Sequence, residues 1–207
     1  PTGHPTYYVR SIISTLGLLK QEAVSPADFA KLIERQEPEL QHTEQYHEKG
    51  AHKGKVRGEY QKLEKTIAKN RELLQLYQQY EAHLKAERRF DYNDLIIETL
   101  AALESHQDML RDVQERYQYV LADEHQDVNG AQNQLLELLC SYHDRPNIFV
   151  VGDEKQAIYR FQGASLENFL YFEDRFPGTI TIALTENYRS GQSALDLAHE
   201  RIHVGDV

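Results

Sequence analysis

The sequence predicts an α/β fold, a parallel sheet with flanking helices, in the second half of the chain, preceded by an all-helical section. Three short apolar runs, at 120–122, 147–151 and 179–184, are typical of strands. Helical patterns lie between them at 131–142 and 166–176. Strands and helices that alternate in this way form a parallel sheet with right-handed crossovers.

The chain begins with a helical pattern over residues 7–33, which restarts at Ser25. Ser25 is the expected N-cap of the second helix, with Pro26 at its first position and Asp28 at N3. These residues therefore predict a short helical hairpin.

Residues 37–58 lack periodicity and contain Lys53, Lys55 and Arg57. A mobile basic loop that contacts DNA phosphates and an ordinary solvated loop are equally consistent with this composition. Residues 59–88 form the longest periodic segment, which predicts a helix of roughly 45 Å. Its interrupted heptads favour an antiparallel partner within the chain, and we expect the helix at 7–19 to be that partner.

Acidic and polar residues follow each predicted strand. The first run ends in Asp123 and Glu124, the second in Gly152 and Asp153, and the third reaches the segment 186–190. Ligands bind at the carboxyl edge of such sheets, so one acid could face a magnesium ion while its neighbour faces a water. The alternative is that Asp-Glu begins a turn and caps the following helix.

Three segments resemble motifs of a known family. Asp123–Asp127 (Asp-Glu-His-Gln-Asp), Val151–Ala164 and Asn187–Ser190 look like motifs II, III and IV of the superfamily 1 helicases of the UvrD/Rep type. The resemblance implies the back half of a RecA-like motor domain, part of a P-loop NTPase, at residues 90–207. It also implies a helical insertion subdomain at residues 1–89.

The resemblance further implies ATP and Mg²⁺ as cofactors. Asp123 would hold the magnesium ion through water, Glu124 would polarise the attacking water, and Gln156 and Arg189 would contact the γ phosphate. The nucleotide site would also include Gln126, Asp127 and Asp153, and Tyr188 would stack on the base.

DNA contact would involve Tyr159, Arg160, Phe161 and Gln162. The basic segment with Lys53, Lys55 and Arg57 would contribute in addition. The two aromatic rings project to one side of an extended segment and could stack on bases, unless both belong to the core. The sequence departs from the family here, because Gln162 stands where arginine is usual and Phe161 where many members have tryptophan.

The composition of the chain bears on how it could bind DNA, whether it could cross a membrane and which compartment it occupies. The 207 residues carry a formal net charge of −10, so DNA contact must be local rather than due to the overall field. No apolar run approaches the roughly 20 residues needed to cross a bilayer. The single cysteine, Cys140, lies among leucines and predicts a core thiol in a reducing, cytoplasmic compartment.

The resemblance implies that the chain is an internal part of an ATP-dependent DNA helicase and behaves as the family does. It would translocate 3′ to 5′ on single strands and unwind duplex DNA, in DNA repair or replication. The sequence contains no Gly-x-x-x-x-Gly-Lys-Ser/Thr, so the isolated chain is predicted inactive. The expected partners are single-stranded and duplex DNA, the Walker A region upstream and a second motor domain downstream. The alternatives are a non-catalytic DNA-binding or protein-docking module and the helicase portion of a recombination helicase-nuclease.

Overall fold

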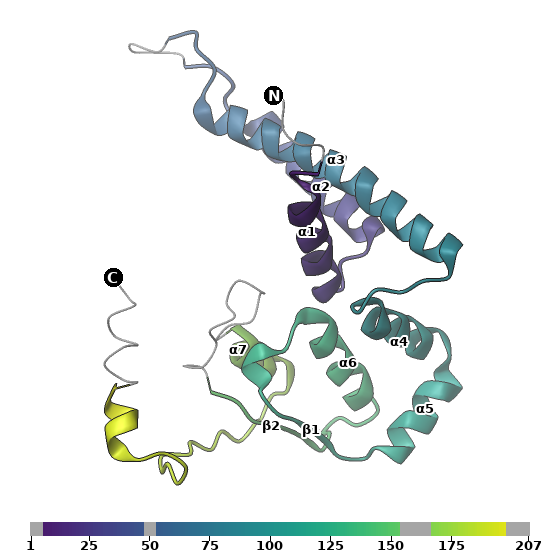
Figure 1. Ribbon diagram of the computed structural model, residues 1–207, viewed down its shortest axis with the longest axis vertical. Helices are drawn as coiled ribbons and strands as arrows, with labels where there is room; N and C mark the ends of the chain where they lie inside the picture. Colours follow the sequence, from purple (N-terminus) through teal and green to yellow (C-terminus); the bar gives the residue numbers. More distant parts are fainter. Residues whose placement is uncertain (1–5, 48–52, 154–166, 198–207) are drawn as a thin grey trace. The chain divides into compact units, whose positions relative to one another are not determined.

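The computed structural model describes residues 6–47, 53–153 and 167–197 (Figure 1). The chain separates into two compact units, Pro1–Phe172 and Glu173–Val207. The described part is mostly helical and includes one small parallel sheet. Its elements are α1 (Val9–Gln21), α2 (Pro26–His42), α3 (Gly58–Glu87), α4 (Asp94–Ser105), α5 (Gln107–Arg116), β1 (Val120–Ala122), α6 (Gly130–Cys140), β2 (Ile148–Val150) and α7 (Glu167–Arg175).

The helices α1, α2 and α3 form the helical section of the first unit (Figure 1). Their core contains Phe29 and Ile33 of α2 against Ile67 of α3, and Leu19 of α1 packs at its edge. The long helix α3 is confirmed, but the prediction that α1 is its main partner is wrong. Helix α2 fills that role because it presents two large apolar side chains to α3.

Helix α2 begins as the sequence predicts and ends later. Ser25 Oγ accepts a hydrogen bond of 3.1 Å from the backbone N–H of Asp28, which confirms the N-cap. The helix then continues through Pro38 to His42, whereas the sequence predicted irregular structure from residue 37. Proline removes one helical hydrogen bond, and the packing of Leu40 against the α2–α3 core stabilises the turn beyond it.

The described residues of the connection between α2 and α3 form backbone hydrogen bonds with one another. Tyr46 and Val56 form an antiparallel bridge, and the backbone N–H of His47 donates to the carbonyl of Lys55 at 3.0 Å. Gly54 has a φ of +80°, a conformation that glycine adopts without steric cost. Lys53 and Lys55 are exposed on this connection.

The sheet consists of β1 and β2, which pair in parallel with Val120 beside Ile148, Leu121 beside Phe149 and Ala122 beside Val150. Helix α6 connects the two strands and packs against β1. The buried Cys140 at its end confirms the predicted core thiol, and burial raises the pKa of that thiol to about 11.

The third predicted strand, at 179–184, is absent from the second unit. Residues 179–187 have no regular structure, and Ile180, Ile182 and Leu184 are 84%, 72% and 86% exposed. A strand requires a neighbour for its backbone hydrogen bonds, and alternation of Thr and Ile alone does not provide one. Among residues 6–47, 53–153 and 167–197, no helix combines the length and apolarity needed to cross a membrane.

Candidate functional site

The acidic residues gather at the carboxyl edge of the sheet, in the first unit. The backbone N–H of Val151 donates to Ala122 at 2.9 Å, and that of His125 donates to Val151 at 2.9 Å. These two bonds extend the pairing past the ends of β1 and β2. They hold the loop 123–127, which we call the acidic loop, beside the segment that leads to Asp153.

Asp123 and Glu124 are both exposed and have different backbone roles. Asp123 follows β1 directly, and its Oδ1 accepts a hydrogen bond of 2.9 Å from the backbone N–H of Glu124. Glu124 has φ 52° and ψ 40°, the left-handed region that costs a non-glycine residue free energy. Strain of this kind is often found where a side chain must be held in a particular direction.

Gln126 connects the acidic loop to the second strand. Its side chain is buried, its Nε2 donates to Glu124 Oε2 at 2.6 Å, and its Oε1 accepts from the backbone N–H of Asp153 at 3.1 Å. One amide therefore fixes the direction of the Glu124 carboxylate and the separation of the two strand ends. The family resemblance implies that Gln126 couples the acidic motif to its neighbours, but the partner, 27 positions away in the sequence, was not predicted.

The acidic loop is completed by a short 3-10 turn, His125–Asp127. His125 is fully buried, with its ring edge-on to Phe172 at 5.5 Å between ring centres. Asp127 is exposed, and its backbone N–H donates to the carbonyl of Glu124 at 2.9 Å. Helix α6 follows at once, opened by a capping box between Asn129 and Gln132 that the Asn-x-x-Gln spacing could have predicted.

Two other predicted site residues belong to the second unit. Tyr188 and Arg189 are exposed in the second unit, where Asn187 Oδ1 accepts from the backbone N–H of Arg189 at 2.9 Å. Five predicted residues fall outside the described residues: Gln156, Tyr159, Arg160, Phe161 and Gln162. The structure thus brings together Asp123, Glu124, Gln126, Asp127 and Asp153.

The three cations of the basic segment, Lys53, Lys55 and Arg57, differ in exposure and in pairing. Lys53 and Lys55 are exposed, whereas the guanidinium of Arg57 pairs with Glu44 at 2.8 Å and is only partly exposed. We therefore expect the two lysines to be better placed than Arg57 for contact with an external anion.

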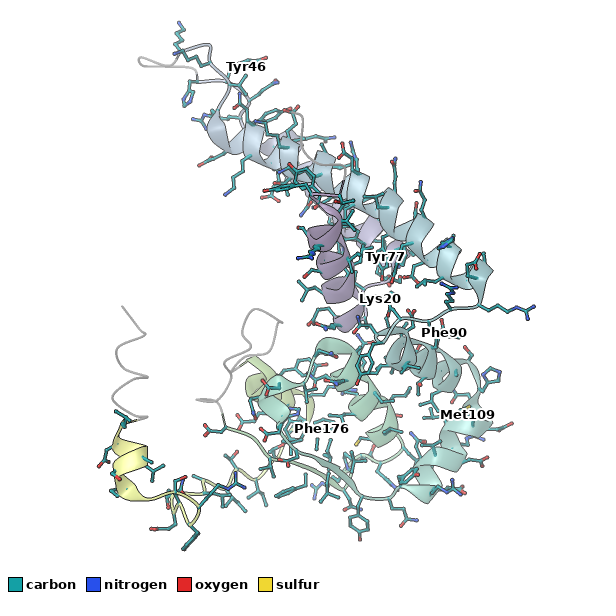
Figure 2. All side chains as sticks on the ribbon, in the orientation of Figure 1. Lys20, Tyr46, Tyr77, Phe90, Met109 and Phe176 are labelled. Atoms are coloured by element: carbon teal, nitrogen blue, oxygen red, sulfur yellow. The ribbon has the colours of Figure 1, made fainter. Side chains whose placement is uncertain are left out.

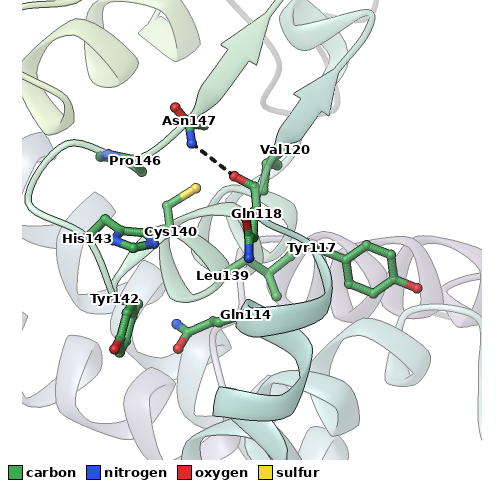
Figure 3. A pocket seen from close by; sticks show the side chains of 10 residues that line it. All are labelled: Gln114, Tyr117, Gln118, Val120, Leu139, Cys140, Tyr142, His143, Pro146 and Asn147. Atoms are coloured by element: carbon green, nitrogen blue, oxygen red, sulfur yellow. Dashed lines mark hydrogen bonds between the residues drawn. The ribbon is translucent and has the colours of Figure 1, made fainter.

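A small pocket lies at the opposite end of the strands from the acids (Figure 3). It is lined by Gln118 and Asn147, whose side-chain amide donates to the Gln118 carbonyl at 3.3 Å, and by Cys140. These residues precede β1 and β2 or end α6, so the pocket is remote from the acidic loop.

Comparison with known proteins identifies the family. The model of the UvrD/REP helicase N-terminal domain matches residues 9–177. This chain belongs to the UvrD/REP helicase family. Similar curated proteins include the ATP-dependent DNA helicase PcrA of Leuconostoc citreum, 30% identical over 197 residues, which are 95% of this chain and 22% of that protein. PcrA of Staphylococcus aureus and of Staphylococcus epidermidis are each 39% identical over 127 residues, 61% of this chain and 17% of theirs.

The chain therefore spans about a fifth of the length of the curated relatives it matches. Membership of the UvrD/REP family confirms the resemblance drawn from the three motifs. In the described residues, no three His, Cys, Asp or Glu side chains are grouped so that they could hold a metal ion by themselves. The exposed carboxylates at this edge of the sheet are of the kind that can hold a magnesium ion together with phosphate and water.

Proposed function

We propose that the chain is the middle part of an ATP-dependent DNA helicase that translocates 3′ to 5′ on single strands and unwinds duplex DNA, in repair or replication. The observation that carries the proposal is the bridge from Glu124 through Gln126 to Asp153. It holds a carboxylate in a fixed direction at the edge of a parallel sheet, where nucleotides bind in α/β proteins. We also propose the RecA-like motor and helical insertion, with their boundary at about residue 89, and a cytoplasmic location.

Each residue of the acidic loop has a proposed task. Asp123 carries the negative charge that a hydrated magnesium ion requires, and that ion would neutralise phosphate charge when bound. Glu124 accepts a proton from the attacking water or orients it. Gln126 is a positioning residue, because its side-chain amide donates to one oxygen of the Glu124 carboxylate and fixes the direction of that carboxylate. Asp127 and Asp153 are the remaining polar residues at the edge of the proposed nucleotide site.

Other roles rest on the family alone. Gln156 and Arg189 would contact the γ phosphate and Tyr188 the base. Single-stranded DNA would stack on Tyr159 and Phe161, flanked by Arg160 and Gln162. We further propose that the chain alone does not hydrolyse ATP, since its sequence lacks the phosphate-binding glycine loop and its lysine. The Walker A region and the second motor domain of the parent protein would supply the rest of the site.

The test is ATP turnover by the full-length parent protein, with and without single-stranded DNA, beside its Glu124→Gln variant. We expect DNA-stimulated turnover in the parent and a loss of roughly 100-fold or more in the variant, with ATP binding retained. Gln has the shape of Glu but cannot accept the proton. Turnover that is equal in the two proteins would reject Glu124 as the base. The absence of turnover in the parent would favour a non-catalytic DNA-binding or docking module.

A further inference from the structure

The last turn of α1 contacts two parts of the molecule at once. Lys20 lies where α1, α3 and α4 meet (Figure 2), and its Nζ is 2.7 Å from Glu81 and 2.6 Å from both Asp91 and Asp94. Only 1% of its side chain is exposed. A buried cation with three carboxylate partners from two other segments fixes α1 in one place relative to α3 and to the start of α4.

Two residues later, Glu22, the C-cap of α1, meets the first residue of α6. A Cβ added to Gly130, the first residue of α6, would lie 2.5 Å from Glu22 Oε2 and 3.1 Å from Glu22 Cα. A side chain at position 130 would therefore displace the Glu22 carboxylate and crowd the Glu22 backbone, so glycine allows this close approach. The Glu22 carboxylate also lies at the N-terminus of α6, where the helix dipole favours negative charge. Gly130 is three residues from Asp127, the end of the acidic loop.

The contact between Glu22 and Gly130 therefore joins the acidic loop to the helical section through a single helical turn. The exposed lysines of the helical section, Lys53 and Lys55, are on the connection between α2 and α3. The core of Phe29, Ile33 and Ile67 holds that pair of helices together, and Leu19 of α1 packs against it. A displacement of α2 and α3 thus reaches α1 through packed side chains and buried ion pairs rather than through a flexible linker.

We propose that the Glu22–Gly130 contact couples DNA held on the helical section to ATP turnover at the acidic loop. Glu22 and Gly130 are positioning residues, because neither is among the residues proposed to touch ATP or DNA. This inference rests on the proposed function and adds to it a route by which DNA stimulates hydrolysis. The charge and the close fit of the contact give it one preferred arrangement, which a movement of α1 would disturb.

The test compares variants of the full-length parent protein by the ratio of ATP turnover with a DNA duplex that carries a single-stranded tail to turnover without DNA. A loss of folded protein lowers both rates in proportion and leaves this ratio unchanged. Gly130→Ala overfills the contact, and Glu22→Ala removes its carboxylate. The matched control is Gly58→Ala, which adds a methyl group to the first residue of α3, where nothing lies within 4 Å.

We expect Gly130→Ala and Glu22→Ala each to lower the ratio by roughly 2- to 30-fold, the range of coupling changes seen for residues between two sites. Turnover without DNA should stay near that of the unmodified parent, and Gly58→Ala should keep the full ratio. A ratio at the unmodified level in either test variant would overturn the coupling. If the unmodified parent shows no turnover at all, the proposed function fails instead, so the two failures are distinguishable.

Discussion

Glu124 combines an exposed carboxylate with a backbone conformation that favours glycine. Glycine at this position would relieve the backbone but could not accept a proton. We therefore predict that Glu124→Gly is more stable than Glu124→Ala by about 1 kcal/mol in the free energy of unfolding, since alanine keeps the strain. Both variants lose the carboxylate, so both should abolish ATP turnover in the parent protein.

Denaturant unfolding of the chain measures the difference in stability. Arg88 is the matched control, because it has the same φ of 52° at the end of α3, far in sequence from the acidic loop. Arg88→Gly should stabilise the chain in the same way and leave turnover unchanged. Equal stability of Glu124→Gly and Glu124→Ala would show that the backbone of Glu124 stores no strain.

Among the elements, the junction of α1, α3 and α4 depends on ionised groups. Burial disfavours the charged form of Lys20, but the hydrogen bonds that Lys20 donates to Asp91 and Asp94 and its ion pair with Glu81 outweigh burial, and the pKa of Lys20 is raised. Burial alone would also raise the pKa of Asp91. Hydrogen bonds from Lys20 and from the backbone of Asp94 outweigh it and hold the Asp91 pKa below its usual value.

The sign of the pH dependence follows from these directions. A carboxylate whose pKa is lower in the folded state stabilises the fold fully above its unfolded pKa, here 3.8, and less as the pH falls through the folded pKa. Lys20 stays charged throughout this range. We predict that the chain loses stability as the pH falls below about 4, and that Asp91→Asn is less stable at pH 7 and has a flatter pH profile.

The measurement is the free energy of unfolding between neutral and acidic pH. Asp112→Asn is a suitable control. It removes the same charge as Asp91→Asn, but from an exposed position on α5. It should leave the pH profile as it is in the unmodified chain. A steep acid transition that persists in Asp91→Asn would place its cause outside this junction.

The same elements show what the sequence could predict. The Ser25 cap, the long α3, both strands of the sheet and the position of α6 were predicted because short-range spacing determines them. The pairing of α3 with α2, the continuation past Pro38 and the ion pairs of Lys20 depend on packing between distant segments. Lys20 and Asp94 are 74 positions apart, and no local pattern indicates that they meet. The strand expected at 179–184 is absent, because a strand must pair with a neighbouring strand and the β propensity of its residues does not supply one.

For the molecule as a whole, charge limits where DNA can bind. The formal net charge of −10 repels DNA, so any attraction must come from a local group of cations. Lys53 and Lys55 are exposed cations close together in sequence, on the connection between α2 and α3, whereas Arg57 is paired with Glu44. In the parent protein these two lysines are therefore our candidates for contact with duplex phosphates.

We predict that replacing both lysines with glutamine weakens duplex binding by the parent protein and lowers its salt dependence. Each phosphate contact releases counterions, so the slope of log K against log salt should become shallower by about 2 units for the pair. The control is Arg111→Gln with Arg116→Gln, which removes the same charge from exposed positions on α5. If both double variants change the slope equally, the effect belongs to the overall field and Lys53 and Lys55 do not contact DNA directly.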